Sequence, residues 1–310
     1  MVKAKKDIKI KDKKGQNANQ PFDFSQDSYL ERTSRPIYAI VLLLPLIIFY
    51  EWGTFHFHTD VAKDVAQRIT AFVWLQNLLE PLGYGGKFAW VAPPLAVVAI
   101  LLAQQITSGK KWHFIPGDIL PMTIECVLLA VPLVVLSLFL NSWAVPQVDV
   151  DRLSSAAVHT GGSQSPSYLA IADGSPSSLS AEPSIDRSDS PVIAQIVMAI
   201  GAGIYEELVF RLILICVLMV LFEDVLRLPY KNAIVLSVLF SAALFSAHHH
   251  IDFLTGRPYE AEPFNMTEFI FRTIAGVYFA ALFAIRGFGI TAGTHAFYDI
   301  IAVSITARFF

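Results

Sequence analysis

The sequence predicts an all-α fold, a polytopic transmembrane helical bundle of about seven to eight spans. Of its 310 residues, 54% are hydrophobic and only 16% are charged, whereas soluble domains carry about a quarter charged residues. The charges are also clustered, because long uncharged stretches alternate with short charged ones. Spans that alternate with loops produce this pattern. Helices are expected because the apolar runs are too long for barrel strands, and no other spanning structure satisfies its backbone in lipid.

The first half of the chain is expected to hold a tail and three spans. Residues 1–35 are polar and rich in lysine, which predicts a disordered basic tail. Residues 36–141 form the N-terminal transmembrane part, with spans expected at Ile37–Phe55, Phe88–Ala103 and Ile119–Leu140. Within the mixed segment 56–87, apolar residues recur at helical spacing with charges between them. This pattern predicts a helix on the membrane surface.

A polar loop separates this part from the rest of the chain. Residues 142–191 are rich in serine, proline and aspartate and lack apolar periodicity, which predicts disorder. Residues 192–310 then form a second transmembrane part, with spans expected at Val192–Phe222, Ala233–Ala247, Phe269–Ile285 and Phe288–Ala307.

The charge pattern also indicates the surroundings of the protein. Basic residues flank several spans, and the positive-inside rule places the N-terminus and the loop with Lys110 and Lys111 in the cytoplasm. We therefore expect a multi-pass protein of the cell membrane, with the lipid bilayer as one partner. The net charge of −3 gives no indication of a nucleic-acid partner.

Three charged residues interrupt the run that begins at residue 192. A charge in the middle of a span costs about 2.5 kcal/mol or more, so Glu206, Glu207 and Arg211 require an explanation. Glu207 and Arg211 are four residues apart and share a helix face, so they can form a structural ion pair. Glu206 lies about 100° around the helix from Glu207, so this ion pair does not account for it. A carboxylate held in such surroundings can serve as a general base.

Histidines mark two further spans. His248, His249 and His250 follow the run 233–247, where they could form an interfacial polar cap or bind metal. Adjacent histidines on a regular helix point about 100° apart, so all three cannot serve one ion. His295 and Asp299 lie four residues apart in the last span, where the carboxylate can orient the imidazole. A satisfied buried pair is the alternative, but a histidine within lipid favours function.

The three elements occur in the order GIYEELVFR, FSAHHHI and GTHAFYD. This series of EExxxR, FxxxH and HxxxN/D motifs on separate helices resembles the CPBP family. That family comprises CAAX-processing and bacteriocin-processing (ABI-type) enzymes and includes the type II CAAX prenyl endopeptidases. The resemblance covers about residues 192–307 and implies that residues 192–310 form a catalytic transmembrane domain. The FxxxH spacing from Phe245 selects His249, although His248 also follows an alanine.

The resemblance implies an intramembrane endopeptidase acting on a membrane-associated peptide or protein, such as a lipidated peptide. Glu206 would activate water with help from His249, and Glu207 with Arg211 would hold the site together. His295 and Asp299 would line the side where the oxyanion develops. An ionised Asp299 cannot donate a hydrogen bond, so it would instead orient His295. No cofactor is expected, since HExxH is absent. A divalent metal such as zinc, bound through His248, His249 or His250, is the alternative.

Two other classes of function are compatible with these residues. A non-proteolytic membrane scaffold could retain a buried polar cluster, but it would be expected to lose part of an unused site. A proton-coupled transporter could use the glutamates and histidines as a proton relay. Such a transporter would be expected to carry an inverted repeat, and the sequence contains no recognisable one.

Overall fold

The computed structural model describes residues 25, 27–57, 69–83, 89–143, 192–253, 256–258 and 264–309. Its order of elements is α1 (Tyr29–Thr33), α2 (Pro36–Phe57), α3 (Thr70–Leu79), η1 (Glu80–Leu82), α4 (Ala92–Thr107), η3 (Pro116–Asp118), α5 (Ile119–Trp143), α7 (Val192–Glu207), η5 (Leu208–Leu214), α8 (Ile215–Met219), η6 (Val220–Val225), α9 (Tyr230–Ala247), β1 (Ile251–Asp252), β2 (Arg257–Pro258), α10 (Met266–Arg286) and α11 (Phe288–Phe309). The fold is thus mostly helical, and β1 and β2 form one short antiparallel hairpin that the sequence did not predict.

Among the described residues, five helices are long and apolar enough to cross a membrane, namely α2, α5, α9, α10 and α11. The chain is therefore a multi-pass membrane protein. Large apolar side chains such as Ile48, Leu120 and Leu128 point outward and are more than half exposed, as lipid contact requires. The helix expected at Phe88–Ala103 is α4, which has the same length but lies four residues later in the chain, at Ala92–Thr107. Pro93 and Pro94 lie in its first turn rather than in its interior, since that turn needs no backbone N–H donors.

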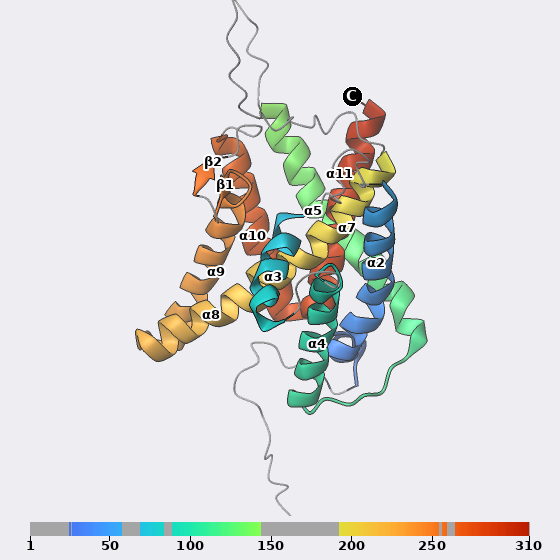
Figure 1. The fold of residues 1–310 in the computed structure, drawn as a ribbon, viewed down its shortest axis with the longest axis vertical. Helices are drawn as coiled ribbons and strands as arrows, with labels where there is room; N and C mark the ends of the chain where they lie inside the picture. The colour runs from blue at the N-terminus through green and yellow to red at the C-terminus, as the bar shows by residue number, and fades with distance from the viewer. Residues whose placement is uncertain are drawn as a thin grey trace, which may run out of the picture.

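The run that begins at Val192 forms one uninterrupted helical path to Val225. It passes from α7 into the π-helical segment η5, then through α8 into a second π-helical segment, η6. In Figure 1 this path runs obliquely through the middle of the molecule, with α2 and α11 on one side and α9 and α10 on the other. The π-helical segment η5 starts directly after Glu207, and such wide turns often occur at functional sites.

Small residues let other helices approach α7 closely. A Cβ atom added at Gly203 would lie 2.4 Å from the backbone nitrogen of Ala296 on α11, so no larger side chain fits without movement. Gly201 faces the ring of Tyr50 on α2 in the same way. The buried apolar core lies around this helix and includes Leu43, Phe72, Ile204 and Leu208. The packing of α7 thus determines where α11 presents its side chains.

A saturated ion pair joins the N-terminal part to the end of α10. The guanidinium of Arg286 binds both carboxylate oxygens of Glu125 on α5, at 2.5 and 2.8 Å. It also donates to the carbonyl oxygen of Leu30 and to the hydroxyl of Thr33, while Tyr29 donates to Glu125. We call these five residues the Arg286 cluster.

The structure of residues 29–33 corrects one prediction about the tail. Residues 1–35 were expected to be disordered, but Tyr29–Thr33 forms α1. Arg32 binds Asp118 through two hydrogen bonds of 3.0 Å, and Arg35 pairs with Glu31. These arginines are therefore structural partners as well as flanking charges. Residues 1–24 lie outside the described residues, as do most of the predicted loop 142–191 and residues 58–68 of the mixed segment.

Candidate active site

The first motif lies at the junction of α7 and η5, where its two glutamates face different neighbours. Glu206 and Glu207 are both buried, and Arg211 is completely buried in the π-helical turn that follows. Because consecutive helical residues point about 100° apart, Glu206 faces the end of α9 while Glu207 faces α11. The site therefore consists of two charged clusters that originate from adjacent positions of one helix.

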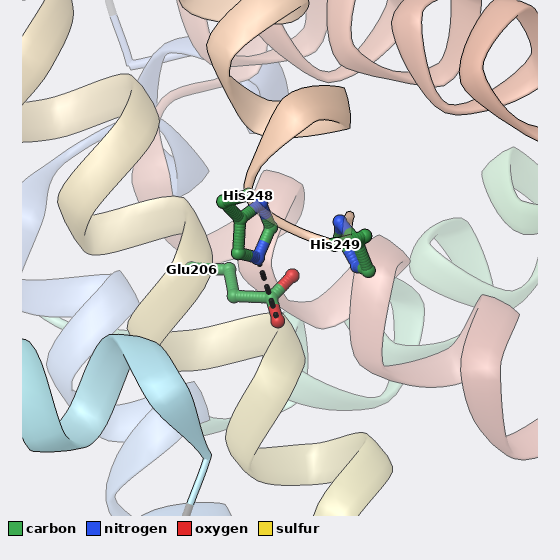
Figure 2. Close-up of side chains that lie close together, drawn as sticks. All are labelled: Glu206, His248 and His249. Carbon is green, nitrogen blue, oxygen red and sulfur yellow. Dashed lines mark ion pairs between the residues drawn. The ribbon is translucent and has the colours of Figure 1, made fainter. Parts of the chain in front are cut away.

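The Glu206 cluster contains Glu206, His248 and His249 (Figure 2). The Nε2 atom of His248 lies 3.6 Å from Glu206 Oε1, and His249 lies beside the same carboxylate. Each of the three side chains offers a ligand atom within 4.8 Å of the other two. A carboxylate and two imidazoles at this spacing can share a water molecule or hold a divalent cation.

The histidines gather at this place because α9 ends before them. Its last residue is Ala247, and His248, His249 and His250 form the turn that follows. The ring centroids of His248 and His249 are only 3.9 Å apart. His250 points elsewhere and packs against Phe264 and Phe269, so it is not part of the cluster. The metal-binding group suggested by three histidines is thus reduced to two of them and Glu206.

Phe245 fixes the orientation of both imidazoles. Its carbonyl oxygen is in hydrogen-bond contact with Nδ1 of His248 and with Nδ1 of His249, the latter at 3.0 Å. A carbonyl oxygen only accepts, so each Nδ1 carries the proton and donates it. This leaves Nε2 of His248 facing Glu206. Hydrogen bonding of one ring nitrogen to a backbone carbonyl is how proteins commonly orient a reactive or ligating histidine.

The Arg211 cluster contains Arg211, Glu207, His295 and Asp299 and forms a chain of contacts. Arg211 Nε lies 3.1 Å from Glu207 Oε2, and Glu207 Oε1 lies 2.8 Å from His295 Nδ1. His295 Nε2 in turn lies 3.4 Å from Asp299 Oδ2. The expected pairing within each helix is therefore present, and Glu207 additionally connects α7 to α11. This last contact was not predicted, because it depends on how the two helices pack.

Aromatic rings surround the Arg211 cluster. The guanidinium of Arg211 lies over the ring of Phe245 at 4.1 Å and near that of Phe279 at 5.4 Å. The Phe279 ring stacks on His295 with a centroid distance of 4.5 Å. Phe245 also contacts the His295 ring edge-on, so it lies between the two clusters. Sequence reasoning used Phe245 only as a spacing mark and missed Phe279, since neither ring titrates or binds metal.

Comparison with known families agrees with this arrangement. Residues 188–301 match the family described as type II CAAX prenyl endopeptidase Rce1-like. This part of the chain belongs to that family. The peptidase domain so defined contains both charged clusters, and its family hydrolyses peptide bonds in membranes. No curated protein and no solved structure matches the chain.

The match leaves α1 to α5 outside the peptidase domain. One of these helices nevertheless reaches the site. Trp74 on α3 contacts the ring of His248 with a centroid distance of 5.8 Å. Sequence periodicity identified α3 only as a helix with an apolar face, and no pattern within one helix indicates what that face meets.

Proposed function

We propose that the protein is an intramembrane endopeptidase that hydrolyses a peptide bond in a membrane-associated or lipidated peptide, with Glu206 as the base that activates water. The single observation behind this assignment is the difference between two adjacent glutamates. Glu207 is bound by Arg211 and His295, whereas Glu206 is buried and faces two imidazoles at a distance that leaves room for reaction. A buried carboxylate without a saturating partner is suited to accept a proton.

In the first step, a water molecule beside Glu206 attacks the carbonyl carbon of the scissile peptide bond. Its proton passes to the Glu206 carboxylate as the new carbon–oxygen bond forms. His248 and His249 orient this water, because their Nδ1 atoms are held by the Phe245 carbonyl oxygen. Holding the reactants in place in this way is a large part of what an active site contributes.

The carbonyl oxygen then carries a negative charge that needs a donor. His295 is the candidate, because Glu207 holds its Nδ1 atom and its Nε2 atom remains able to donate when the ring is protonated. Asp299 lies 3.4 Å from that nitrogen and orients the ring. When the tetrahedral intermediate collapses, the carbon–nitrogen bond breaks and Glu206 returns its proton to the leaving amine. The products are a carboxylate and a free amine.

The Glu206 cluster also favours a metal-assisted variant of the same reaction. One carboxylate and two imidazoles fit a divalent cation such as zinc with one position left for water. The hydrogen bonds from the Nδ1 atoms of His248 and His249 to the Phe245 carbonyl oxygen support this variant. Metal-ligating imidazoles usually donate their other N–H to a backbone or side-chain acceptor in this way. A bound cation would make the water more acidic at the same place.

We further propose that α4 and the path from Val192 to Val225 also cross the membrane, which gives about seven spans. The N-terminus would then lie in the cytoplasm of a cell membrane. Supporting this orientation, basic residues gather at one end of the bundle, where Lys111 pairs with Asp27 and Arg286 binds Leu30 and Thr33. A cysteine in place of Lys110 should react with a membrane-impermeant maleimide only after the membrane is opened.

Cleavage of a panel of fluorogenic lipidated peptides by the purified protein in liposomes tests the proposed function. We expect the wild type to cleave and Glu206→Gln to lose about a thousandfold in rate, as for the loss of an essential base. Glu223→Gln is the matched control, because Glu223 lies on the same helical path about 25 Å away. Chelation separates the two mechanisms, since it abolishes only the metal-assisted one.

The outcomes also distinguish the other classes of function. Full activity in Glu206→Gln would exclude Glu206 as the base. A wild type that cleaves no peptide in the panel but moves protons in the same liposomes would favour a transporter, provided that Glu206→Gln abolishes the flux. Absence of both activities would favour a scaffold.

A further inference from the structure

Helix α3 lies against the peptidase domain at the position of its proposed base. Its residues Ala71, Phe72 and Leu75 are buried, and Phe72 packs edge-on against Tyr205 with a centroid distance of 5.0 Å. Tyr205 directly precedes Glu206. This small helix, which lies outside the family match, is thus fixed beside the active site by its own apolar face.

The next residues of α3 bring an aromatic ring to the histidine. The indole of Trp74 meets the ring of His248 at 5.8 Å and at a steep angle of 65°. Trp74 also contacts Phe253, whose ring stacks on the indole at 5.6 Å and 18°. Phe210 contacts both rings, at 6.2 Å from Trp74 and 4.7 Å from His248. His248 therefore lies among three aromatic side chains, including Phe245.

These contacts restrict rotation of the His248 ring. Rotation of the ring away from Glu206 about its bond to Cβ would break the hydrogen bond from Nδ1 to the Phe245 carbonyl oxygen. Trp74 and Phe210 contact the same ring, so a rotation would also have to displace their side chains. His249, the histidine of the FxxxH spacing, packs against Phe245 and His248 but has no contact with Trp74 among the described residues. The two histidines are thus held differently.

We propose that His248 is the histidine that assists Glu206 and that Trp74 is its positioning residue. The N-terminal part of the chain then completes an active site that the peptidase domain does not form alone. This inference rests on the proposed function, because it assigns a role within the same site. Trp74 acts through His248 and contacts neither the scissile bond nor the water.

Steady-state cleavage by Trp74→Leu and Trp74→Phe tests this role. We expect Trp74→Leu to lower kcat about tenfold while KM changes less than about twofold, because the base partner is misplaced and substrate contacts are retained. Trp74→Phe should recover most of the activity, since a phenyl ring still limits the rotation of His248. Trp112→Leu is the control, because Trp112 is an exposed tryptophan in the connection between the end of α4 and the start of η3.

A double-mutant cycle separates positioning from general support of the fold. In His248→Asn protein, Trp74→Leu should lower kcat by less than about twofold further, because the residue it positions is gone. The same tenfold loss in both backgrounds would overturn the proposal, as would a larger loss of kcat in His249→Asn than in His248→Asn. Retention of activity in Glu206→Gln would instead refute the proposed function, whereas it would not bear on the contact between Trp74 and His248.

Chemical modification provides a readout that needs no substrate. Diethyl pyrocarbonate acylates accessible imidazoles, and mass spectrometry reports the rate at each histidine. Trp74→Leu should raise the rate at His248 several-fold relative to that at His250, because the indole covers the ring. Phe253→Leu keeps the test available if Trp74→Leu does not fold, since Phe253 is partly exposed and its loss releases the indole. Unchanged rates at His248 in folded variants would overturn the proposal.

Discussion

The protein contains two buried arginines that pair with carboxylates, Arg286 and Arg211. The Arg286 cluster and the Arg211 cluster differ in how many of their donors and acceptors form hydrogen bonds. In the Arg286 cluster, the guanidinium makes four hydrogen bonds, two of them to Glu125. In the Arg211 cluster, the guanidinium has one ion pair with Glu207 and a long contact of 3.4 Å to Gly276, while its Nη1 has no partner among the described residues. Glu206, one position before Glu207, has the Nε2 atom of His248 at 3.6 Å.

This difference distinguishes charged groups that stabilise the fold from charged groups that remain available for a reaction. A buried charge is tolerated when its hydrogen bonds are complete, and removing one partner then costs several kcal/mol. A site that must bind a water and a peptide cannot use all of its donors and acceptors on itself. The Arg286 cluster should therefore control stability, and the Glu206 cluster should control cleavage. Substitutions in each can break or sharpen this distinction.

The largest effect on stability is expected from Glu125→Leu. It leaves the Arg286 guanidinium without a counter-charge and should lower the free energy of unfolding by about 3 kcal/mol. The protein that remains folded should cleave at the wild-type rate, because the hydrogen bonds of Glu125 are to Tyr29 and Arg286 and not to the Glu206 or Arg211 cluster. Thermal unfolding in detergent and kcat per folded molecule check both statements, and a loss of kcat in the folded fraction would contradict the distinction.

A smaller effect should come from the close approach of α7 and α11. Gly203→Ala places a Cβ 2.4 Å from the backbone of Ala296, so the helices must separate. We expect a loss of about 1–3 kcal/mol in unfolding free energy. Cleavage should also fall, because α11 carries His295. Gly117→Ala is the control, since a Cβ there meets no atom within 4 Å, and equal stability of the two variants would argue against the tight contact.

Glu206→Gln should change stability by less than about 1 kcal/mol, in either direction, although we expect it to lower the cleavage rate about a thousandfold. Among the described residues, the nearest partner of the carboxylate is His248 at 3.6 Å, and a neutral amide is less costly to bury. Chemical denaturation of wild type and variant in the same detergent provides the comparison. A marked destabilisation would indicate that Glu206 is a structural charge after all.

The smallest effect concerns Glu31, which lies outside the spans. The hydrogen bond from Arg35 lowers the pKa of Glu31 below its ordinary value of 4.5. A carboxyl group with a lowered pKa in the folded state stabilises the protein above its unfolded pKa, and this contribution is lost as the pH falls below about 4.5. Glu31→Gln should therefore lower the free energy of unfolding by at most about 1 kcal/mol at pH 7 and by less at pH 3, and thermal unfolding at the two pH values measures this difference.

Most helices and most site residues could be predicted from the sequence, because both depend on local patterns. Long apolar runs gave α2, α5 and α9 to α11, and the i,i+4 spacing gave the Glu207–Arg211 and His295–Asp299 pairs. Roles in catalysis remain predictions for all of these residues.

Contacts between helices could not be predicted in this way. The spacing from Phe245 selected His249, which stays a prediction, but the sequence did not indicate that His248 would also lie beside Glu206, with its Nε2 atom 3.6 Å from the carboxylate. Nothing in the sequence indicated that Trp74 would meet His248, since the two residues lie 174 positions apart on elements that no shared motif connects.

The π-helical turn after Glu207 has a consequence for how α9 is aligned. Wide turns release backbone carbonyls from their usual helical partners, and the Phe210 carbonyl oxygen accepts a hydrogen bond of 2.6 Å from Ser241 on α9. This hydrogen bond fixes the position of α9 along its axis relative to η5. A shift of α9 by a single residue would displace His248 by about 1.5 Å along the helix axis, which is enough to break its contact with Glu206. Extra residues in the turn between η6 and α9 should accordingly be tolerated, whereas an insertion between Ser241 and His248 should not.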